Sequence, residues 1–140
     1  MTFRQITQIA GSAMTAQTVR LNTVASNLAN AQSAAGTEAE AYRARKPVFA
    51  SVFEGGSADG TVAGARVQVL DVVQSDEPVR RAHEPDHPLA DADGTVYYPN
   101  VNPVAEMTDM MSASRAFETN VEVMGRVKQM QQSLLRLGEG

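Results

Sequence analysis

The sequence predicts an α+β chain in which two long terminal helices flank a small β lobe with an extended loop. Apolar residues recur at helical spacing at both ends of the 140 residues. Between the ends, β-branched and partly alternating segments are separated by glycine- and proline-rich stretches. We therefore expect three parts: an N-terminal helix in residues 1–33, a linker with a small β lobe in residues 34–99, and a C-terminal helix in residues 100–140.

The N-terminal segment is predicted to be a helix that is covered on several sides. Residues 1–31 contain no acidic residue and only two basic ones, Arg4 and Arg20. A solitary solvated helix usually carries lysine and glutamate on its outer face, whereas neutral polar side chains are buried at lower cost than charges. An alanine-rich surface helix is the alternative. The stripe with alternating spacings of three and four consists of Thr7, Ala10, Met14, Gln17, Leu21, Val24, Leu28 and Ala31, and Phe3 and Ile6 extend it backwards.

The C-terminal segment is also predicted to be a helix. Pro103 suits the first helical position, Asn102 suits the N-cap, Glu106 lies in the first turn, and Gly138 and Gly140 end the pattern. Two rotated apolar stripes run along this helix, and one partner helix could not cover both. The alternative is an ordinary core helix, although a bundle would need a third long helix. The stripes are Met107, Met110, Ser114, Phe117, Val121 and Met124, and Val123, Val127, Met130, Leu134 and Leu137.

The middle of the chain is predicted to be mostly extended. Alanine, serine, glycine and charged residues dominate its start, and three prolines, Pro78, Pro85 and Pro88, interrupt residues 76–93. The expected elements are a linker at 32–46, strands at 47–53 and 66–73, a loop at 55–60, irregular chain at 76–93 and a short strand at 94–98.

The composition excludes several classes of protein. The net charge of −4 is of the wrong sign for a nucleic-acid binder, and no apolar stretch approaches the ~20 residues of a membrane span. The absence of cysteine excludes disulfides, thiolate metal sites and a cysteine nucleophile. Only 29 residues are leucine, isoleucine, valine or phenylalanine, a fraction just above the ~20% at which disorder becomes the default. We therefore expect the chain to complete its burial against other chains.

One segment matches the zinc-protease pattern His-Glu-x-x-His. That pattern works on a helix, where His83 and His87 would share one face and Glu84 would activate a water. Pro85 lies inside the required turn and Pro88 follows it, and proline costs a helix interior about 3 kcal/mol. We expect a solvated turn and no metal site.

No other catalytic pattern is convincing. Residues 91–94 (Asp-Ala-Asp-Gly) resemble the start of a calcium loop, but position 102, where the closing glutamate belongs, is Asn102. A turn with Gly94 at positive φ explains these residues better. No histidine is placed as a base for a serine, and no glycine-rich phosphate loop is present. We expect no enzymatic activity, no cofactor and no small-molecule substrate.

Four segments carry further motifs: residues 25–31, 42–49, 91–104 and 111–121. Together with the order of elements, these segments resemble the bacterial flagellar axial proteins, the family of rod and hook proteins. The resemblance is strongest to the proximal-rod branch and spans about residues 3 to 137, except the loop near 54–65. Ser33 and Ala105 depart from the usual threonine and glutamate. The motif residues are Ser26, Asn27, Ala29, Asn30, Tyr98, Pro99, Asn100, Asn102 and Pro103.

The resemblance implies a structural subunit of the proximal rod, the part of the flagellar drive shaft that transmits torque across the periplasm. The terminal helices would pair as a coiled-coil-like layer, and neighbouring subunits would cover their outer stripes. Export would use the flagellar type III apparatus without a cleaved signal peptide. The partners would be other copies, other rod proteins, and membrane-ring and export-apparatus components at the rod base, with no nucleic acid.

Two alternatives stay open beside this function: a soluble flagellar adaptor or export chaperone, and more remotely a zinc hydrolase at His83 and His87. The expected assembly interface comprises Ala10, Met14, Leu21, Val24, Leu28, Met107, Met110, Phe117, Val121, Met124, Val127, Met130 and Leu134.

Overall fold

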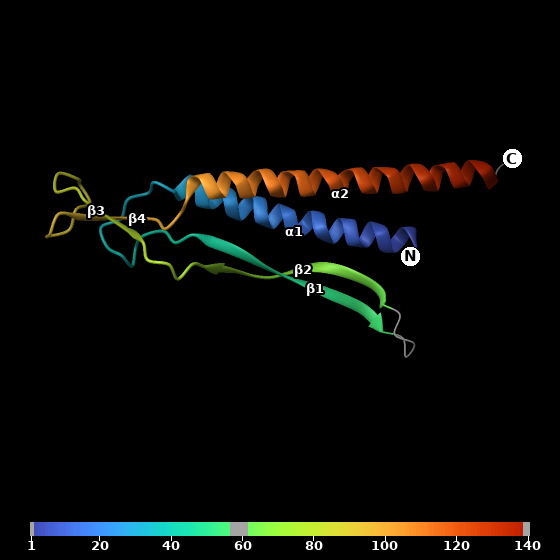
Figure 1. The fold of residues 1–140 in the computed structure, drawn as a ribbon, viewed down its shortest axis with the longest axis horizontal. Coiled ribbons are helices and arrows are strands. Elements are labelled where there is room, and N and C mark those ends of the chain that lie inside the picture. The colour runs from blue at the N-terminus through green and yellow to red at the C-terminus, as the bar shows by residue number, and fades with distance from the viewer. Residues whose placement is uncertain (1, 57–61, 139–140) are drawn as a thin grey trace. The chain divides into compact units, whose positions relative to one another are not determined.

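The computed structural model describes residues 2–56 and 62–138, with two helices and four strands (Figure 1). This confirms the predicted α+β class. Most of the loop predicted at 55–60 lies outside the described residues. In chain order the elements are α1 (Phe3–Asn30), β1 (Arg45–Gly56), β2 (Val62–Gln74), β3 (Arg80–His83), β4 (Thr95–Tyr98) and α2 (Pro103–Gly138).

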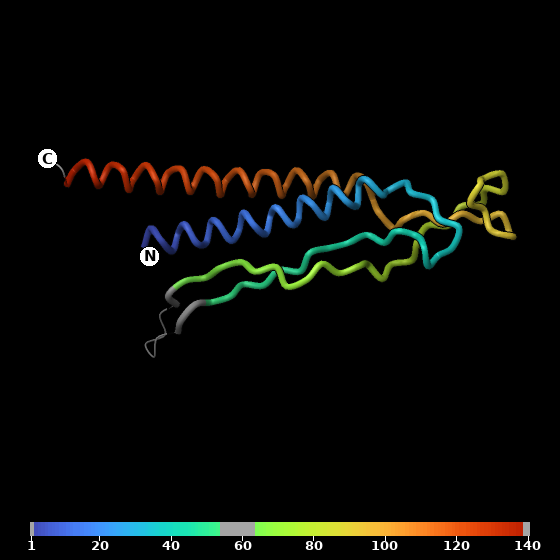
Figure 2. The backbone as a smooth tube through the Cα atoms, turned by 180° about the vertical axis from the view of Figure 1, so that it is seen from behind, coloured from blue at the N-terminus to red at the C-terminus, as the bar shows by residue number. Residues whose placement is uncertain are grey.

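The chain divides into two compact units, and both helices and both long strands contribute residues to each unit. Within each unit a stretch of α1 runs beside a stretch of α2 in the opposite direction (Figure 2). Unit 1 consists of Met1–Val19, Val48–Asp71 and Ser112–Gly140, and unit 2 consists of Arg20–Pro47 and Val72–Met111.

Both helices begin with a side-chain cap. The Thr2 hydroxyl accepts a hydrogen bond from the Gln5 amide (3.3 Å), and the Gln5 side chain accepts one from the Thr2 amide (2.7 Å), which makes a reciprocal capping box. The Asn102 side chain accepts from the amides of Val104 (3.1 Å) and Ala105 (3.2 Å). The predicted N-cap of the second helix is therefore confirmed, because Asn102 satisfies amides that have no partner within the helix.

The strands form two separate pairs. β1 pairs with β2, and both are longer than the predicted strands. β3 pairs with β4 in antiparallel register, with Arg80 opposite Tyr98 and Arg81 opposite Tyr97. β4 was predicted, whereas the interpretation of residues 76–93 as wholly irregular is wrong. β3 shows no apolar alternation, and it is stabilised by guanidinium groups that lie over the tyrosine rings, at 4.8 Å for Arg80 and 5.7 Å for Arg81.

The buried interior is thin in both units, as the composition predicted. The fully buried apolar residues described in unit 1 are Ala10, Ala16, Ala113 and Val127, so this core consists of small side chains. In unit 2 three of the five alanines of the expected linker, Ala35, Ala41 and Ala44, are buried instead of solvated, and Tyr97 packs on the cluster that contains Ala35 and Ala41. The buried apolar residues of unit 2 are Val24, Ala31, Ala35, Ala41, Ala44, Val79 and Val96.

Candidate assembly interface

Asn27 organises the hydrogen bonds at the end of α1 in unit 2. Its side chain is 1% exposed. The amide oxygen accepts hydrogen bonds from the Arg45 backbone N–H (2.9 Å) and from the Tyr42 hydroxyl (2.9 Å), and the amide nitrogen donates to the Arg45 carbonyl (2.8 Å). Ser26 also lies 3.1 Å from the Tyr42 hydroxyl. Asn27 therefore pairs with both backbone groups of the first residue of β1, as a neighbouring strand would.

The side chain of Asn100 binds the backbone of the adjacent residue, Ala44. Its oxygen accepts from the Ala44 N–H (2.7 Å), and its nitrogen donates to the Glu77 carbonyl (2.7 Å). Asn27 and Asn100 thus hold two consecutive residues, Ala44 and Arg45, where the chain enters β1. We call these two side chains the asparagine junction. The segment between α1 and β1 is therefore fixed by side chains of the helix and of the loop before α2.

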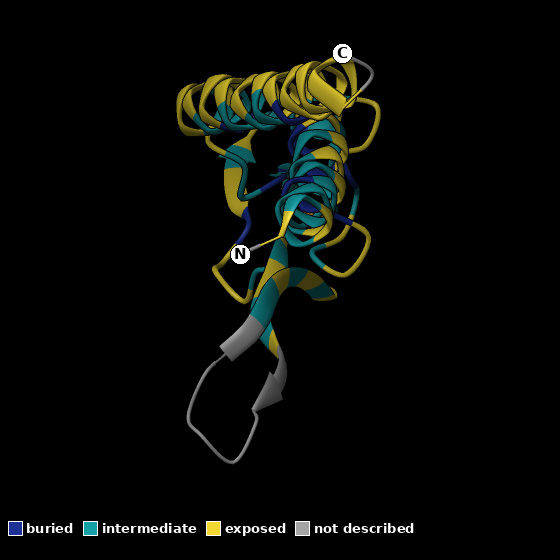
Figure 3. Cartoon of the chain, turned by 90° about the vertical axis from the view of Figure 1, so that its right-hand side faces the viewer, coloured by how far each residue is buried: buried dark blue, intermediate teal, exposed yellow. Residues whose placement is uncertain are grey.

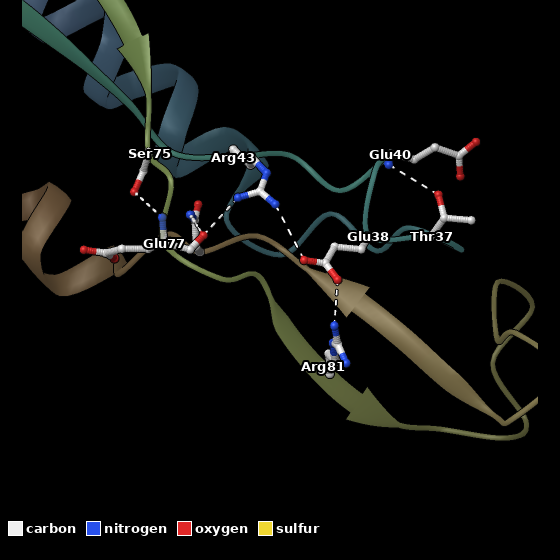
Figure 4. A network of polar contacts seen from close by, with 8 residues as sticks. Thr37, Glu38, Glu40, Arg43, Ser75, Glu77 and Arg81 are labelled. Carbon is white, nitrogen blue, oxygen red and sulfur yellow. Dashed lines mark hydrogen bonds and ion pairs between the residues drawn. The ribbon is translucent and has the colours of Figure 1, made fainter.

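An ion-pair network lies around the same segment (Figure 4). Glu38 accepts from Arg81 at 2.6 Å and lies 3.7 Å from Arg43. Arg43 also donates to the Glu77 carbonyl at 3.0 Å. The side chains that form these ion pairs are about a third to two thirds exposed, so each pair contributes at most about 1 kcal/mol. The network therefore positions the loop more than it stabilises it.

The turn between β3 and β4 is closed by Asp91. One carboxylate oxygen accepts from the amides of Asp93 (2.9 Å) and Thr95 (2.8 Å), and the other accepts from the Tyr97 hydroxyl (3.3 Å). The hydrogen bond from the Thr95 amide is the main reason that the pKa of Asp91 lies below its ordinary value. Gly94 has a φ of 73°, which confirms the predicted turn with a glycine at positive φ.

The His-Glu-x-x-His segment also forms a turn, as predicted. His83 ends β3, and the Glu84 carboxylate accepts from the Tyr98 hydroxyl (2.9 Å), which raises the pKa of Tyr98. The His87 ring accepts from the Leu89 amide (3.0 Å). Among residues 2–56 and 62–138, no three histidine, aspartate or glutamate side chains are grouped as metal ligands.

Arg20 joins the two helices within unit 2. Its Nε and Nη2 atoms donate to the two carboxylate oxygens of Asp109, and the Nε bond is 3.1 Å long. This hydrogen bonding raises the pKa of Arg20. A bidentate arginine–carboxylate pair has a defined geometry, so it sets which turn of α1 faces which turn of α2. The pattern of α1 alone did not reveal this contact, because the partner lies 89 positions further along the chain.

The residues of the expected interface fall into three classes of exposure. Those buried within the chain already have a partner, whereas the exposed ones form the surface that another chain could cover. Ala10, Val24 and Val127 are buried; Met14, Leu21, Leu28, Met110, Phe117 and Met124 are half-buried; Met107, Val121, Met130 and Leu134 are exposed.

The second apolar stripe of α2 changes from buried to exposed side chains toward the C-terminal end of the helix. Val123 is half-buried and Val127 is buried, whereas Met130, Leu134 and Leu137 of the same stripe are exposed. Every described residue of α2 from 128 onward is exposed, and Figure 3 shows this part of the helix as exposed surface. A groove of about 860 Å³ in unit 1 begins where the cover ends, lined by Phe3, Arg126, Gln129, Met130, Ser133 and Leu134. The helix therefore carries apolar side chains that its own chain does not bury.

Comparison with known families covers both ends of the chain. A family described as "Flagella basal body rod protein" matches residues 8–34, and one described as "Flagellar basal body rod FlgEFG protein C-terminal" matches residues 92–137. The flagellar basal-body rod protein FlgC of Escherichia coli O6:H1 is 48% identical over 139 residues, which is 99% of this chain and 100% of the relative. The chain belongs to the FlgC family of flagellar basal-body rod proteins.

More distant FlgC proteins match over similar lengths. FlgC of Salmonella typhimurium is 45% identical over 99% of this chain and 100% of its own length, and FlgC of Bacillus subtilis is 34% identical over 94% of this chain and 95% of its own. The suspected resemblance to the proximal-rod branch is thus confirmed at the level of the family.

The motif residues of this FlgC-family chain lie in unit 2. Asn27 and Asn100 form the asparagine junction, Asn30 donates to the Ser26 carbonyl (2.8 Å), and Tyr98 bonds Glu84. Pro99 is buried, Pro103 begins α2 after the Asn102 cap, and Ala29 is exposed. Helix-start signals predicted Asn102 and Pro103, whereas the other positions were indicated only by the family motif. The contacts of Ser26 and Asn27 with Tyr42 were not predicted, although the aromatic ring of Tyr42 stands out in an otherwise small and charged segment.

Proposed function

We propose that this chain is a structural subunit of the flagellar basal-body rod and assembles by burying the apolar surface of α2 against neighbouring subunits. Membership of the FlgC family supports a structural role and a place in the basal body. The observation that carries the assembly proposal is that the second apolar stripe of α2 continues beyond Val127, its last buried residue, as exposed side chains. Leu134 is 55% exposed and Leu137 is 79% exposed.

The physical argument concerns the free energy of exposed apolar surface. Burying a leucine side chain contributes about 1.5–3 kcal/mol, so Met130, Leu134 and Leu137 together leave a substantial driving force unused in the single chain. Contiguous apolar patches on otherwise polar proteins mark sites of interaction. Methionine suits such a surface, because its flexible thioether adapts to neighbours of different shape. These features favour a chain that completes its packing in an assembly.

The finer parts of the proposal follow the resemblance to the proximal-rod branch. We place the subunit in the periplasmic rod, where it transmits torque and contacts other copies, other rod proteins and components of the membrane ring. Delivery by the flagellar export apparatus completes this picture. No described helix is both long and apolar enough to span a membrane. The domain division at residues 33/34 and 99/100 assigns the helices to the axial core and the middle segment to contacts outside it.

A pair of matched variants tests this function. Leu134→Asp places an unpaired carboxylate in the apolar stripe, which costs several kcal/mol when the surface is buried. Gln132→Asp adds the same charge two residues away, at an exposed polar position on the other side of the helix. We expect Leu134→Asp to be expressed but absent from isolated basal bodies, with loss of swimming in soft agar, whereas Gln132→Asp is incorporated. Normal incorporation of Leu134→Asp would show that α2 is not the assembly surface.

A further inference from the structure

The groove beside α2 in unit 1 combines apolar and positively charged side chains. Among the residues that the structure describes, Arg126 is the one charged residue that lines it. Arg136 is exposed and lies about 80° from Arg126 around the helix. Residues 123–138 of α2 contain no acidic residue. The groove therefore suits an occupant that is both apolar and acidic. Its large apolar lining residues come from both helices and are Phe3, Met130 and Leu134.

The turn between β3 and β4 in unit 2 has this combination of side chains. Leu89 is 45% exposed, and among the large exposed apolar residues of the described chain it alone lies outside the helices and strands. Asp86 and Asp93 are exposed on the same turn. Residues 84–94 contain four acidic residues and no lysine or arginine. The turn therefore presents an apolar side chain among negative charges.

The turn is held in one conformation by its own hydrogen bonds. The ring of His87 accepts from the Leu89 amide (3.0 Å), and the His87 carbonyl accepts from the Ala90 amide (3.0 Å). The Glu84 amide donates across the turn to the Gly94 carbonyl (2.8 Å). A segment that is ordered before it binds loses little conformational entropy on binding. The exposed Leu89 is therefore already positioned for a partner surface.

We propose that the β3–β4 turn of a second copy of this chain docks in the groove of unit 1, with Leu89 against Met130 and Leu134. The exposed aspartates of the turn then lie beside Arg126. This inference rests on the proposed function, because it names the segment that covers the exposed stripe of α2. The match of an acidic turn with a basic groove favours this partner and orients it.

The contact is heterologous, because it joins different surfaces of the two copies. The turn belongs to unit 2 and the groove to unit 1, and the two surfaces share no residue. One copy therefore offers its turn to one neighbour and its groove to another. Contacts of this type link successive copies instead of closing into a two-fold dimer, which suits a rod.

Disulfide cross-linking between two single variants tests the contact, because the chain contains no cysteine. Leu89→Cys and Leu134→Cys, with different tags, are produced in the same cells, and the isolated basal bodies are oxidised. We expect dimers that carry both tags, whereas each variant produced alone stays monomeric, because the contact joins position 89 to position 134. Gln132→Cys, on the other side of the helix, is the matched control and should give no dimer with Leu89→Cys.

Three cross-linking results would overturn the contact. They are dimers from either single variant alone, equal dimers with Gln132→Cys, and only monomers from the mixed pair in rods of swimming cells. A dimer between Leu134→Cys and Val121→Cys would also overturn it, because Val121 is exposed beside an acidic residue, Glu122, and the groove would then hold a helix.

The proposed function fails by a different result. Monomers from the mixed pair in a working rod leave it intact, because the subunit is then present in that rod. Absence of the unmodified chain from basal bodies would overturn the proposed function itself.

Charge reversal gives a second measurement. R126E/R136E and D86R/D93R should each reduce swimming, because each places like charges opposite each other. The variant that combines all four changes restores opposite charges and should recover most of the swimming. Lys128→Glu reverses a charge about 200° around the helix from Arg126 and should leave swimming unchanged. A combined variant that swims no better than the two double variants would show that these charges do not face each other.

Discussion

At the scale of single residues, the role of Asn27 requires a side-chain amide, which carries a donor and an acceptor together. It offers a donor and an acceptor to the two backbone groups of Arg45, and its oxygen also accepts from Tyr42. An aspartate would lack the donor and would bring a charge into a site that is 1% exposed. The motif asparagine is thus explained by backbone pairing inside the chain.

Removal of this amide should destabilise the chain measurably. Asn27→Ala leaves the N–H and C=O groups of Arg45 without their partner, and an unsatisfied buried polar group costs about 1–3 kcal/mol. We expect the midpoint of urea unfolding to fall, with loss of the protease resistance of residues 31–44. Asn22→Ala replaces an exposed asparagine of the same helix and should leave the midpoint unchanged or raise it slightly. Equal midpoints for the two variants would argue against the junction.

At the scale of elements, the nearly uncharged α1 is explained by what it contacts. Several of its hydroxyl groups donate to carbonyls of the helix itself, as Thr7 does to Phe3 (2.9 Å). Ser12 and Asn27 also bond to backbone outside the helix, as when the Val67 amide donates to Ser12 (3.1 Å) in unit 1. Lysine or glutamate at such positions would have to be buried at higher cost. One of its two charges, Arg20, is paired with Asp109 of α2. The expectation that α1 is covered on several sides is therefore met partly by its own chain.

The Arg20–Asp109 pair should couple the two helices in a double-mutant cycle. Both side chains are about a third exposed, so solvent screening limits the coupling free energy to about 0.5–1 kcal/mol. We expect Arg20→Ala and Asp109→Ala each to lower unfolding stability, and the double variant to lose less than the sum of the two losses. Strictly additive losses would mean that the pair does not set the register of the helices.

At the scale of the whole molecule, burial within a single chain is modest and the end of α2 is exposed. Unit 1 buries mainly alanines, and residues 128–138 are all exposed. A helix end without tertiary packing is marginally stable in water. Stability and assembly are therefore linked, because a partner that binds the folded form shifts the equilibrium toward it.

This linkage predicts that helix content depends on concentration. Circular dichroism of the purified chain should show fewer helical residues at micromolar concentration than the two helices contain. The signal should rise as the chain is concentrated and self-associates. Hydrogen exchange should locate the missing helix in residues 128–138, with residues 20–30 protected by unit 2. Complete protection of residues 128–138 in a demonstrated monomer would contradict the prediction.

Much of the local structure of this protein could be predicted from the sequence alone. The Asn102 cap, the helix start at Pro103, strand β4 and the Gly94 turn were predicted because each depends on residues within a few positions of one another. The apolar stripes likewise indicated two long helices and a surface left for other chains. The family motif pointed to the asparagines without saying what they bind.

The tertiary structure decided what depends on contacts between distant residues. Strand β3 exists because its arginines meet the tyrosines of β4, and the segment after α1 is ordered because Asn27 and Asn100 hold its backbone. The Arg20–Asp109 pair and the point where the cover of α2 ends also depend on residues far apart in the chain. A short segment with weak intrinsic preference takes its conformation from its partners, and those partners become neighbours only when the chain folds.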